Sequence, residues 1–329
     1  MKNKYIIVIG ASAGGTVVLP GLLRQLTEIM DFPIFVVLHL TRQPIGKLVL
    51  QRLQKNTTFT CTIPRHGDRI GASHIYLAPP DYHMMVKKDQ ILISHGPMEN
   101  RYRPSVDTLF RSAAAHFGPR VIGIVLSGML EDGAAGMSAI RRSGGICVVQ
   151  DPNEAQYPDM PQAVLSGLKP DVMLPANEIA PAISKLVSKR KIRKRRIPED
   201  VIKEAEIAEK VYVGIDHVEG LGEPSVFSCP DCGGRLWEID HNGVSNYRCH
   251  AGHAYTEDSL LGTMEATTES ALWIALRILE ERRNLMKKMG DKEKQNGRHK
   301  MSQAYSKRSR ELQVQIDHLR SLLIGEKTK

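Results

Sequence analysis

The sequence predicts an α/β protein in which a doubly wound, mostly parallel sheet precedes a small cysteine-containing module and a helical tail. Three observations predict this order. Apolar strand patterns alternate with helical patterns over roughly the first 185 residues, which is typical of a parallel sheet with helices on both faces. Two close pairs of cysteine or histidine follow between Cys229 and His253. The last ~65 residues then repeat leucine, isoleucine and methionine at helical spacing.

The first predicted strand covers 6–9, a β-branched apolar run of the kind that is buried on both faces of a sheet. A glycine-rich turn follows, and leucines then recur at the spacing of a helix that begins near Gly15. The same criteria extend along the chain. We expect strands at 32–38, 58–63, 74–77, 84–86, 90–93, 121–126, 146–150 and 171–174, and helices at 46–53, 104–116, 134–142, 162–166 and 179–186.

The length of 329 residues is enough for more than one domain. We expect a sheet domain at 1–188, a basic and charged linker at 189–224 with a surface helix at 198–210, a cysteine-containing module at 225–258, and a helical tail at 259–329. In the tail, an interruption at 290–297 separates two helices. They are expected to form an antiparallel hairpin or coiled coil, which favours a homodimer.

The net charge of +9 has one main source, since seven of the eight residues at 189–196 are basic. A single basic run is more often a solvated linker than a nucleic-acid surface. Aromatic residues make up only 5 % of the chain and do not interleave with the run, so nucleic acid is an unlikely partner. No apolar run reaches the ~18 residues of a membrane span, and the first run is too short for a signal peptide. We expect a cytoplasmic protein with no membrane insertion.

The turn after the first strand, 10–14, reads Gly-Ala-Ser-Ala-Gly and fits G-x-S-x-G, the pattern of a nucleophile elbow with Ser12 at its apex. Small neighbours allow the sharp turn that holds a hydroxyl above the strand ends. The start of the next helix offers free N–H groups to a developing oxyanion. The same residues also suit a phosphate-binding loop or a plain tight turn, so the motif alone does not decide.

Two further polar residues follow strands in the same way: His39 follows the second strand, and Asp132 follows the strand at 121–126. Because the carboxyl ends of parallel strands meet at one edge, Ser12, His39 and Asp132 are expected to converge. A hydroxyl, an imidazole and a carboxylate are the groups needed for nucleophilic acyl transfer. The alternatives are that His39 only caps a strand and that Asp132 caps the helix at 134–142. Dinucleotide binding is disfavoured, because His39 stands where an acidic residue would hold the ribose.

Six motifs resemble those of one family, the catalytic domain of chemotaxis protein-glutamate methylesterases. The resemblance covers about residues 4–187, and the motifs occur in the family's order. They are Ile-Gly-Ala-Ser-Ala-Gly-Gly at 9–15, Val-Leu-His-Leu at 37–40, Tyr-Leu-Ala-Pro-Pro-Asp-Tyr-His-Met at 76–84, Asn-Arg-Tyr-Arg-Pro-Ser-Val-Asp at 100–107, Ser-Gly-Met-Leu-Glu-Asp-Gly-Ala at 127–134 and Met-Pro at 160–161. The segment 1–188 is identified on this basis as a methylesterase catalytic domain.

The resemblance implies hydrolysis of glutamate γ-methyl esters on the cytoplasmic helices of chemoreceptors, or on a related methylated signalling protein, with some members also deamidating glutamine. Ser12 would be the nucleophile, His39 the base and Asp132 the residue that orients it. We expect backbone N–H groups near Ala13 and Met129 to bind the oxyanion. The family needs no metal or organic cofactor for this step. The sequence departs from the family in lacking a receiver domain before the first strand, and in having Leu130 where glycine is usual.

Cys229 and Cys232 form a C-x-x-C knuckle, and Cys249 and His253 follow across a stretch with strand patterns at 235–238 and 245–248. This spacing is typical of a zinc ribbon, and thiolate and imidazole ligands suit tetrahedral Zn²⁺. We expect these four residues to bind a structural zinc ion, with His250 as the alternative fourth ligand. The other interpretation is a group of free thiols. The module at 225–258 is therefore predicted to be zinc-ribbon-like, with a docking or structural role.

A second function remains open for the whole chain. A non-catalytic signalling adaptor would keep the fold and bind partners through the cysteine module and the helical tail. A nucleic-acid binder that uses 189–196 and the module is a weaker third alternative. The presence of Ser12, His39 and Asp132 together favours the enzyme.

Overall fold

The computed structural model describes residues 5–39, 43–210, 220–240 and 245–324. It divides into two compact units, Met1–Leu260 and Leu261–Lys329. The first unit contains the predicted sheet domain and the cysteine-containing module together, and the second is a helical hairpin. Within these ranges no helix is both long and apolar enough to cross a membrane.

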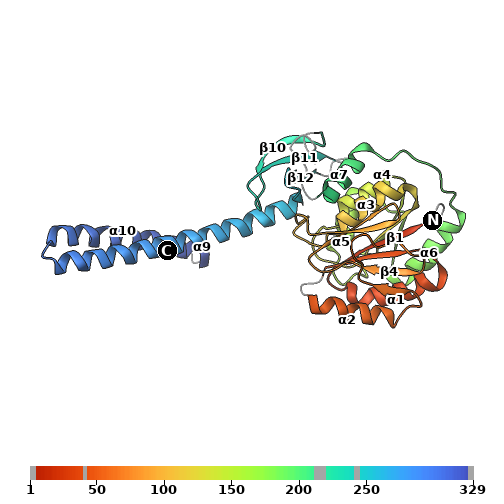
Figure 1. The fold of residues 1–329 in the computed structure, drawn as a ribbon, viewed down its shortest axis with the longest axis horizontal. Helices are drawn as coiled ribbons and strands as arrows, with labels where there is room; N and C mark the ends of the chain where they lie inside the picture. The colour runs from red at the N-terminus through yellow and green to blue at the C-terminus, as the bar shows by residue number, and fades with distance from the viewer. Residues whose placement is uncertain (1–4, 40–42, 211–219, 241–244, 325–329) are drawn as a thin grey trace. The chain divides into compact units, whose positions relative to one another are not determined.

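The first unit is built on a parallel sheet, so the predicted α/β class is confirmed (Figure 1). Every pairing between its described strands is parallel. The central strand is buried along its whole length, as its β-branched sequence predicts. The strand order is β3 (Thr60–Thr62), β4 (His74–Leu77), β2 (Ile34–Leu38), β1 (Ile6–Ala11), β7 (Val121–Val125), β8 (Ile146–Gln150) and β9 (Val172–Leu174).

Helices cover both faces of the sheet and bury one core cluster on each. Leu19, Leu23 and Ile183 belong to the cluster on one face, and Leu109 and Phe110 to the cluster on the other. The first face is covered by α1 (Gly15–Ile29), α2 (Gln43–Gln54) and α6 (Ala176–Lys189), and the second by α3 (Val106–Phe117), α4 (Ala134–Arg142) and α5 (Asp159–Gly167). This double winding leaves the carboxyl ends of the strands free to carry functional groups.

The predicted hairpin is present as β5 (His83–Lys87) and β6 (Gln90–Ser94), an antiparallel pair. It packs on α3, where the amide of Val86 donates to Ser112 Oγ at 3.1 Å. Ser105 caps the start of α3, as expected, by accepting from the amide of Thr108. A short 3-10 turn, η1 (Gly118–Arg120), joins α3 to β7.

The segment that follows the sheet contains the predicted helix, α7 (Glu199–Lys210), but its predicted position at the surface is wrong. Val201 and Ala205 belong to the core cluster that α3 and α4 form, and Glu204 and Ile207 are buried as well. The prediction failed because the helix is rich in Glu and Lys, a composition that is typical of an exposed helix. Residues 191–196 of the basic run, by contrast, are exposed.

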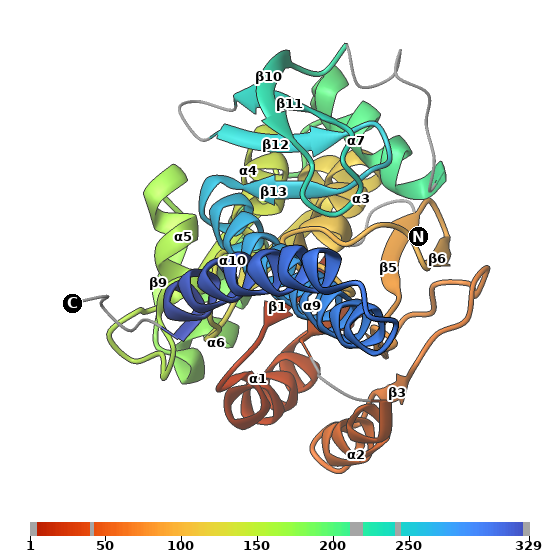
Figure 2. The ribbon, with the colours of Figure 1, turned by 90° about the vertical axis from the view of Figure 1, so that its left-hand side faces the viewer.

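The cysteine-containing module forms a four-stranded antiparallel sheet, and Figure 2 shows its strands side by side. Its strands are β10 (Glu223–Ser228), β11 (Arg235–Asp240), β12 (Ser245–Cys249) and β13 (Ala254–Thr256). Leu236, Trp237 and Tyr247 are buried in it. The last strand reaches the sheet domain, where Ala254 pairs with Glu99 in a parallel bridge.

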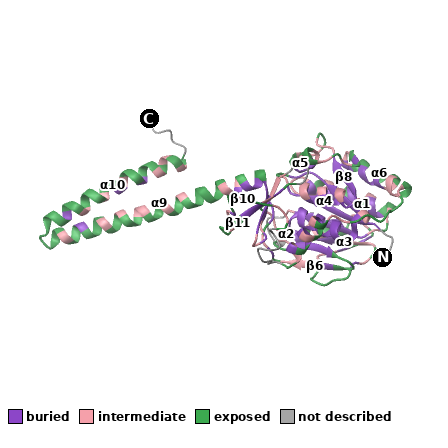
Figure 3. Cartoon of the chain, turned by 90° about the horizontal axis from the view of Figure 1, so that it is seen from above, coloured by how far each residue is buried: buried purple, intermediate pink, exposed green. Residues whose placement is uncertain are grey.

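The tail contains α9 (Glu257–Gln295) and α10 (His299–Ile324), and the second unit is their antiparallel hairpin. Arg283 Nη1 donates to Gln313 Oε1 at 2.5 Å, and Arg320 pairs with Glu280 farther along. Helix α9 continues through Gly290 and ends at Gln295, shortly before Gly297. The interruption between the two helices is therefore shorter than the predicted 290–297. Most of the hairpin's residues are exposed (Figure 3).

Candidate active site and candidate metal centre

Ser12 lies in the turn between β1 and α1. Its amide donates to the carbonyl of Ser127 at 3.0 Å, which ties the turn to the end of β7. Gly14, the N-cap of α1, has a φ of 78°, and a Cβ there would lie 2.6 Å from Ser127 Oγ. Only glycine fits this position without strain. The sharp turn predicted from the G-x-S-x-G motif is therefore present.

Strand register places His39 beside Ser12. Ala11 of β1 is the partner of Leu38 of β2, and the amide of His39 donates to the carbonyl of Ala11 at 3.2 Å. Ser12 and His39 are therefore the next residues along two adjacent parallel strands, which run about 4.8 Å apart.

Asp132 completes the group from the loop after β7. His39 Nε2 and Asp132 Oδ2 lie 2.9 Å apart, and the Asp132 side chain is fully buried. The carboxylate also accepts from Ser105 Oγ at 2.9 Å and from the amides of Val106 and Asp107 at 2.6 and 3.1 Å. The alternative role as cap of α4 is wrong, because Gly133 is that N-cap. Asp132 instead satisfies the free N–H groups of α3.

These contacts set the charge of Asp132. Burial by itself raises the pKa of this carboxyl, but the hydrogen bonds from His39 and from the amides of Val106 and Asp107 outweigh burial and lower it. Burial and the Asp132 charge raise the pKa of Asp107 well above its ordinary value. Of this buried pair, the contacts of Asp132 favour its ionised form, whereas the surroundings of Asp107 favour its protonated form.

His39 presents one nitrogen to Asp132 and keeps the other free. Because Asp132 is ionised, Nε2 carries the proton and donates it. Within the part of the chain that the structure describes, Nδ1 is buried and has no hydrogen-bond partner. The ring of Tyr102 stacks on the imidazole with centroids 3.6 Å apart and planes 7° from parallel. An imidazole with one ring nitrogen bonded to a carboxylate and the other without a partner, next to a serine, is the arrangement of a general base.

Sequence reasoning missed Asn100, Tyr102 and Ser127. Asn100 Nδ2 donates to Asp107 Oδ2 at 2.7 Å and to Asp132 Oδ1 at 3.3 Å. Ser127 Oγ donates to the carbonyl of Ala13 at 2.8 Å and so holds the turn of Ser12. Tyr102 and Asn100 lie within the 100–107 motif, so the motif was seen but the roles of these two residues were not.

The loop after β7 explains two details of the sequence. A Cβ on Gly128 would lie 2.0 Å from the sulfur of Met160 and 2.8 Å from Ser12 Cβ, so the Met-Pro pair packs directly under the turn of Ser12. Leu130 has a φ of 64°, in the left-handed region that favours glycine. The residue that departs from the family pattern therefore keeps the backbone shape that glycine would adopt.

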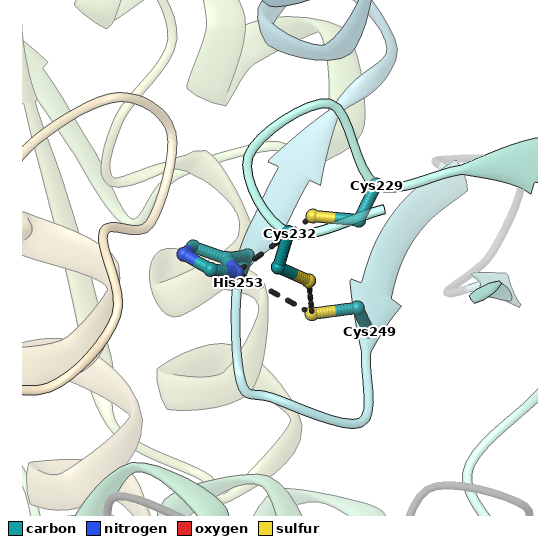
Figure 4. Close-up of side chains that lie close together, drawn as sticks. All are labelled: Cys229, Cys232, Cys249 and His253. Atoms are coloured by element: carbon teal, nitrogen blue, oxygen red, sulfur yellow. Dashed lines mark hydrogen bonds between the residues drawn. The ribbon is translucent and has the colours of Figure 1, made fainter. Parts of the chain in front are cut away.

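The module brings Cys229, Cys232, Cys249 and His253 together, with their ligand atoms all within 4.8 Å of one another (Figure 4). The Sγ atoms of Cys232 and Cys249 are 3.7 Å apart, and His253 Nδ1 is 3.5 Å from Cys249 Sγ and 3.7 Å from Cys229 Sγ. A tetrahedron with Zn–S bonds of about 2.3 Å has edges of about 3.8 Å. The four residues therefore fit tetrahedral zinc.

His250, the alternative ligand, lies outside this group. Its ring packs where a side chain on Gly234 would be, with Cε1 2.5 Å from that position. Inside the group, the hydrogen bond from Cys249 lowers the pKa of the Cys229 thiol to about 3, so one sulfur is a thiolate. The donor set matches a closed structural site rather than one with an open position for substrate.

Comparison with known proteins agrees with this geometry. A model of the CheB methylesterase family matches residues 7–183, more than half of the chain. A Leptospira interrogans protein with the provisional name protein-glutamate methylesterase/protein-glutamine glutaminase is 34% identical over 179 residues, which cover 54% of this chain and 92% of that protein. A protein of the same name from Methanospirillum hungatei is 36% identical over 57% of this chain and 53% of its own length. The chain thus spans about half of this longer relative.

A solved structure shows the same fold. The crystal structure of the Thermotoga maritima CheB methylesterase catalytic domain superposes with a TM-score of 0.53 and 26% identity, and it covers 56% of this chain and 99% of that domain. The matched region ends before the cysteine-containing module. Since the family model, the relatives and the fold agree, the chain belongs to the CheB methylesterase family.

Proposed function

We propose that this chain is a protein-glutamate methylesterase that hydrolyses glutamate γ-methyl esters on the cytoplasmic domains of chemoreceptors, or on a related methylated signalling protein. Its place of action would be the cytoplasm. The names of its relatives support this activity, and so does their second name, since deamidation of glutamine is the same acyl transfer with ammonia as leaving group. One observation carries the proposal: His39 is bonded to buried Asp132 and stands beside Ser12 in the register of β1 and β2.

The proposed steps are those of a serine hydrolase. Ser12 Oγ attacks the ester carbonyl while His39 Nδ1 accepts its proton, and the Nε2–H bond to Asp132 stabilises the resulting imidazolium. His39 then protonates the leaving oxygen, which departs as methanol and leaves the glutamyl side chain esterified to Ser12. A water molecule, deprotonated by His39, attacks this ester and releases the glutamate carboxylate and Ser12.

Backbone N–H groups of the turn are the oxyanion donors in this proposal. Among the described residues, the amides of Ala13, Gly14 and Met129 have no hydrogen-bond partner. Ala13 and Gly14 lie at the start of α1, where the helix dipole favours negative charge.

Ser12→Ala tests the proposal. The variant is expected to lose methanol release from a methylated chemoreceptor fragment, and to lose labelling by a fluorophosphonate probe, while its thermal unfolding stays unchanged. Ser166→Ala, which alters an exposed serine of α5, is the matched control and keeps both activities. Full methanol release by Ser12→Ala would overturn the mechanism. A wild-type chain that neither labels nor releases methanol would favour the adaptor function.

We also propose that Cys229, Cys232, Cys249 and His253 bind a structural zinc ion. The fit of their spacing to a tetrahedron supports it. Zinc bound there would cross-link the knuckle before β11 to the turn between β12 and β13, in a small sheet with few buried apolar residues of its own.

The helical tail is proposed to pair with a second copy of the chain. On α9, Trp273, Ile274 and Ile278 are each about half exposed, an unusual amount for large apolar side chains. Ile274→Glu with Ile278→Glu is expected to convert a dimer to a monomer in light-scattering measurements. A wild-type monomer at high concentration would rule the pairing out.

A further inference from the structure

The side chain of Asn100 connects the zinc-ribbon-like module to Asp132 and to its neighbour Asp107. The Oδ1 atom of Asn100 accepts from the amide of Thr256, the last residue of β13, at 3.0 Å and from Ser259 Oγ, in the first turn of α9, at 3.4 Å. Its Nδ2 atom donates to Asp107 and Asp132. A side-chain amide has two donors and two acceptor lone pairs, so every hydrogen-bonding position of Asn100 is used.

The backbone of the same segment is held by the module as well. The amide of Asn100 donates to the carbonyl of Ala254 at 2.8 Å, and Glu99 bridges to Ala254. Asn100 and Arg101 have φ values of 52° and 69°, a shape that non-glycine residues keep only where their surroundings impose it. The next residue, Tyr102, stacks on His39. The segment 99–102 therefore depends on β13 for its shape and shapes the surroundings of His39 and Asp132.

We propose that the zinc-ribbon-like module is a required part of the catalytic centre: when it binds zinc, β13 holds Asn100 as a positioning residue for Asp132 and Tyr102 as one for His39. The inference rests on the proposed methylesterase function. Loss of the metal lowers activity by releasing segment 99–102, while the sheet that carries Ser12 stays folded.

The path from the metal site to Asn100 is short. Cys249 ends β12 and His253 precedes β13, and the amide of Cys249 donates to the carbonyl of His253 at 3.0 Å. An ion bound to both side chains fixes this turn at its two ends. Ala254, the residue that accepts from the amide of Asn100, comes directly after His253. The proposed metal ligand His253 is therefore the immediate neighbour, in sequence, of the residue that contacts segment 99–102.

A buried network of charges locks the module to the sheet domain beside this path. Arg248 of β12 reaches Glu99 at 3.1 Å and Glu204 of α7 at 3.8 Å, while Arg111 of α3 pairs with Glu99 and lies 3.6 Å from Glu204. Two guanidinium groups and two carboxylates balance in charge. The cavity left at this interface has a volume of only about 10 Å³, so the module packs closely against the sheet domain.

Hydrogen exchange on the full chain tests the coupling without using activity. Zinc-loaded protein and protein stripped with a chelator are compared. We expect faster exchange at the amides of Asn100 and Thr256 after stripping, with unchanged protection in β1 and β7. Equal protection of Asn100 in both forms would overturn the proposal. So would exchange that rises together in β1 and β7, because the metal would then support the whole fold.

Labelling of Ser12 by a fluorophosphonate measures the catalytic consequence. Stripping zinc, or the ligand variant Cys232→Ser, is expected to slow labelling by about 10- to 100-fold, as for other small displacements of catalytic groups. Added zinc restores the stripped wild type but not the variant. Cys61→Ala, a cysteine outside the module, is the control. If wild type labels and stripping changes nothing, this inference fails alone; if wild type does not label, the proposed function fails.

Asn100→Ala separates positioning from stability. Its kcat is expected to fall about 10- to 100-fold with little change in KM, and its labelling responds less to zinc than that of wild type, because the side-chain contacts are lost while the backbone contacts with Ala254 remain. Asn153→Ala, an exposed asparagine in a surface turn, is the matched control. An Asn100→Ala variant that gains as much labelling rate from zinc as wild type does would show that the side chain of Asn100 does not carry the effect of the metal.

Discussion

The protein contains two polar centres that are assembled in opposite ways. Ser12, His39 and Asp132 come from three strand ends far apart in the chain, and only the order β2–β1–β7 brings them together. Cys229, Cys232, Cys249 and His253 come from two tight turns of one small sheet. The first centre depends on the whole fold, whereas the second is local and could hold a metal ion.

This difference indicates where each centre is vulnerable. A change that leaves the parallel sheet intact leaves the positions of Ser12 and His39 intact, because backbone register sets them. The cysteine cluster lies in two turns of a small sheet, and bound zinc would add to its stability. Asn100 connects the two centres, because its side chain bonds both to Asp132 and to the amide of Thr256 at the end of the cysteine-containing module.

The largest effect is expected for Asp132→Asn. The new amide would lose the charge that orients His39 and would point a donor at the N–H groups of α3, so kcat should fall about 10³- to 10⁴-fold. Asp89→Asn, in the exposed turn of the hairpin, is the control. Methanol release measured alongside urea unfolding separates the catalytic loss from the loss of stability. Activity within tenfold of wild type would mean that Asp132 does not act through His39.

The metal centre is tested by His253→Ala against His250→Ala. One of four ligands should supply roughly a quarter of the ~10–16 kcal/mol of a structural zinc site, so zinc affinity should fall about 10²- to 10³-fold for His253→Ala. His250→Ala should bind as wild type. Competition with a chromophoric chelator measures both affinities. If His250→Ala lost zinc affinity and His253→Ala did not, His250 would be the fourth ligand instead of His253.

Acid is expected to weaken the sheet domain through His83. Burial lowers the pKa of His83 to about 4, although the hydrogen bond from Nε2 to the carbonyl of Pro97 acts in the opposite direction. Nδ1 accepts from the amide of Ser105, so a second proton on the ring would break that bond. The unfolded chain binds that proton near pH 6.5. Neutral His83 therefore leaves the free energy of unfolding at its full value above pH 6.5. As pH falls from 6.5 toward 4, the free energy of unfolding decreases by about 3 kcal/mol in all, because the unfolded chain binds the proton first.

Urea unfolding of wild type and His83→Gln at pH 7 and pH 4.5 measures this term. In the variant, the free energy of unfolding should change much less between the two pH values than in wild type, whatever its value at pH 7. Asp132 contributes in the same direction, since its pKa is lowered, but only below its ordinary value near 3.8. An unchanged slope in the variant would assign the acid sensitivity to other groups.

The smallest effect is expected at Leu130. Glycine there would relieve about 1 kcal/mol of left-handed strain but would lose about 0.5–1 kcal/mol to the greater freedom of the unfolded chain. Leu130→Gly should therefore change the free energy of unfolding by less than about 1 kcal/mol. Leu130→Val, with its branched Cβ, should destabilise more. Equal stability of Leu130→Val and wild type would contradict the positive φ.

The sequence was sufficient for the central strands β1, β2, β7 and β8, because each is a largely β-branched run followed by a helical pattern. Ser12, His39 and Asp132 could be placed at one edge because each lies in the connection that follows such a run. The burial of α7 could not be predicted, since Glu204 reads as a solvated charge until Arg111 and Arg248 are placed beside it. Composition reports how polar a segment is, not which partners surround it.

The contacts of Asn100 were beyond sequence reasoning for a similar reason. Asn100 and Thr256 are far apart in the chain, and no periodic pattern relates them. The stacking of Tyr102 on His39 depends in the same way on a backbone shape that the module imposes. Local patterns specify strands and turns, whereas contacts between domains arise only once both are folded.

The four charges at the junction of the module and the sheet domain restrict how such a protein can be re-engineered. A chimaera that grafts residues 223–256 onto a simpler esterase would bring Arg248 without Glu204, which belongs to α7. A buried guanidinium deprived of its carboxylate costs about 3–5 kcal/mol, enough to offset much of a domain's stability. The module therefore cannot be moved to another protein by itself. A chimaera that folds must also contain α7, Glu99 and Arg111.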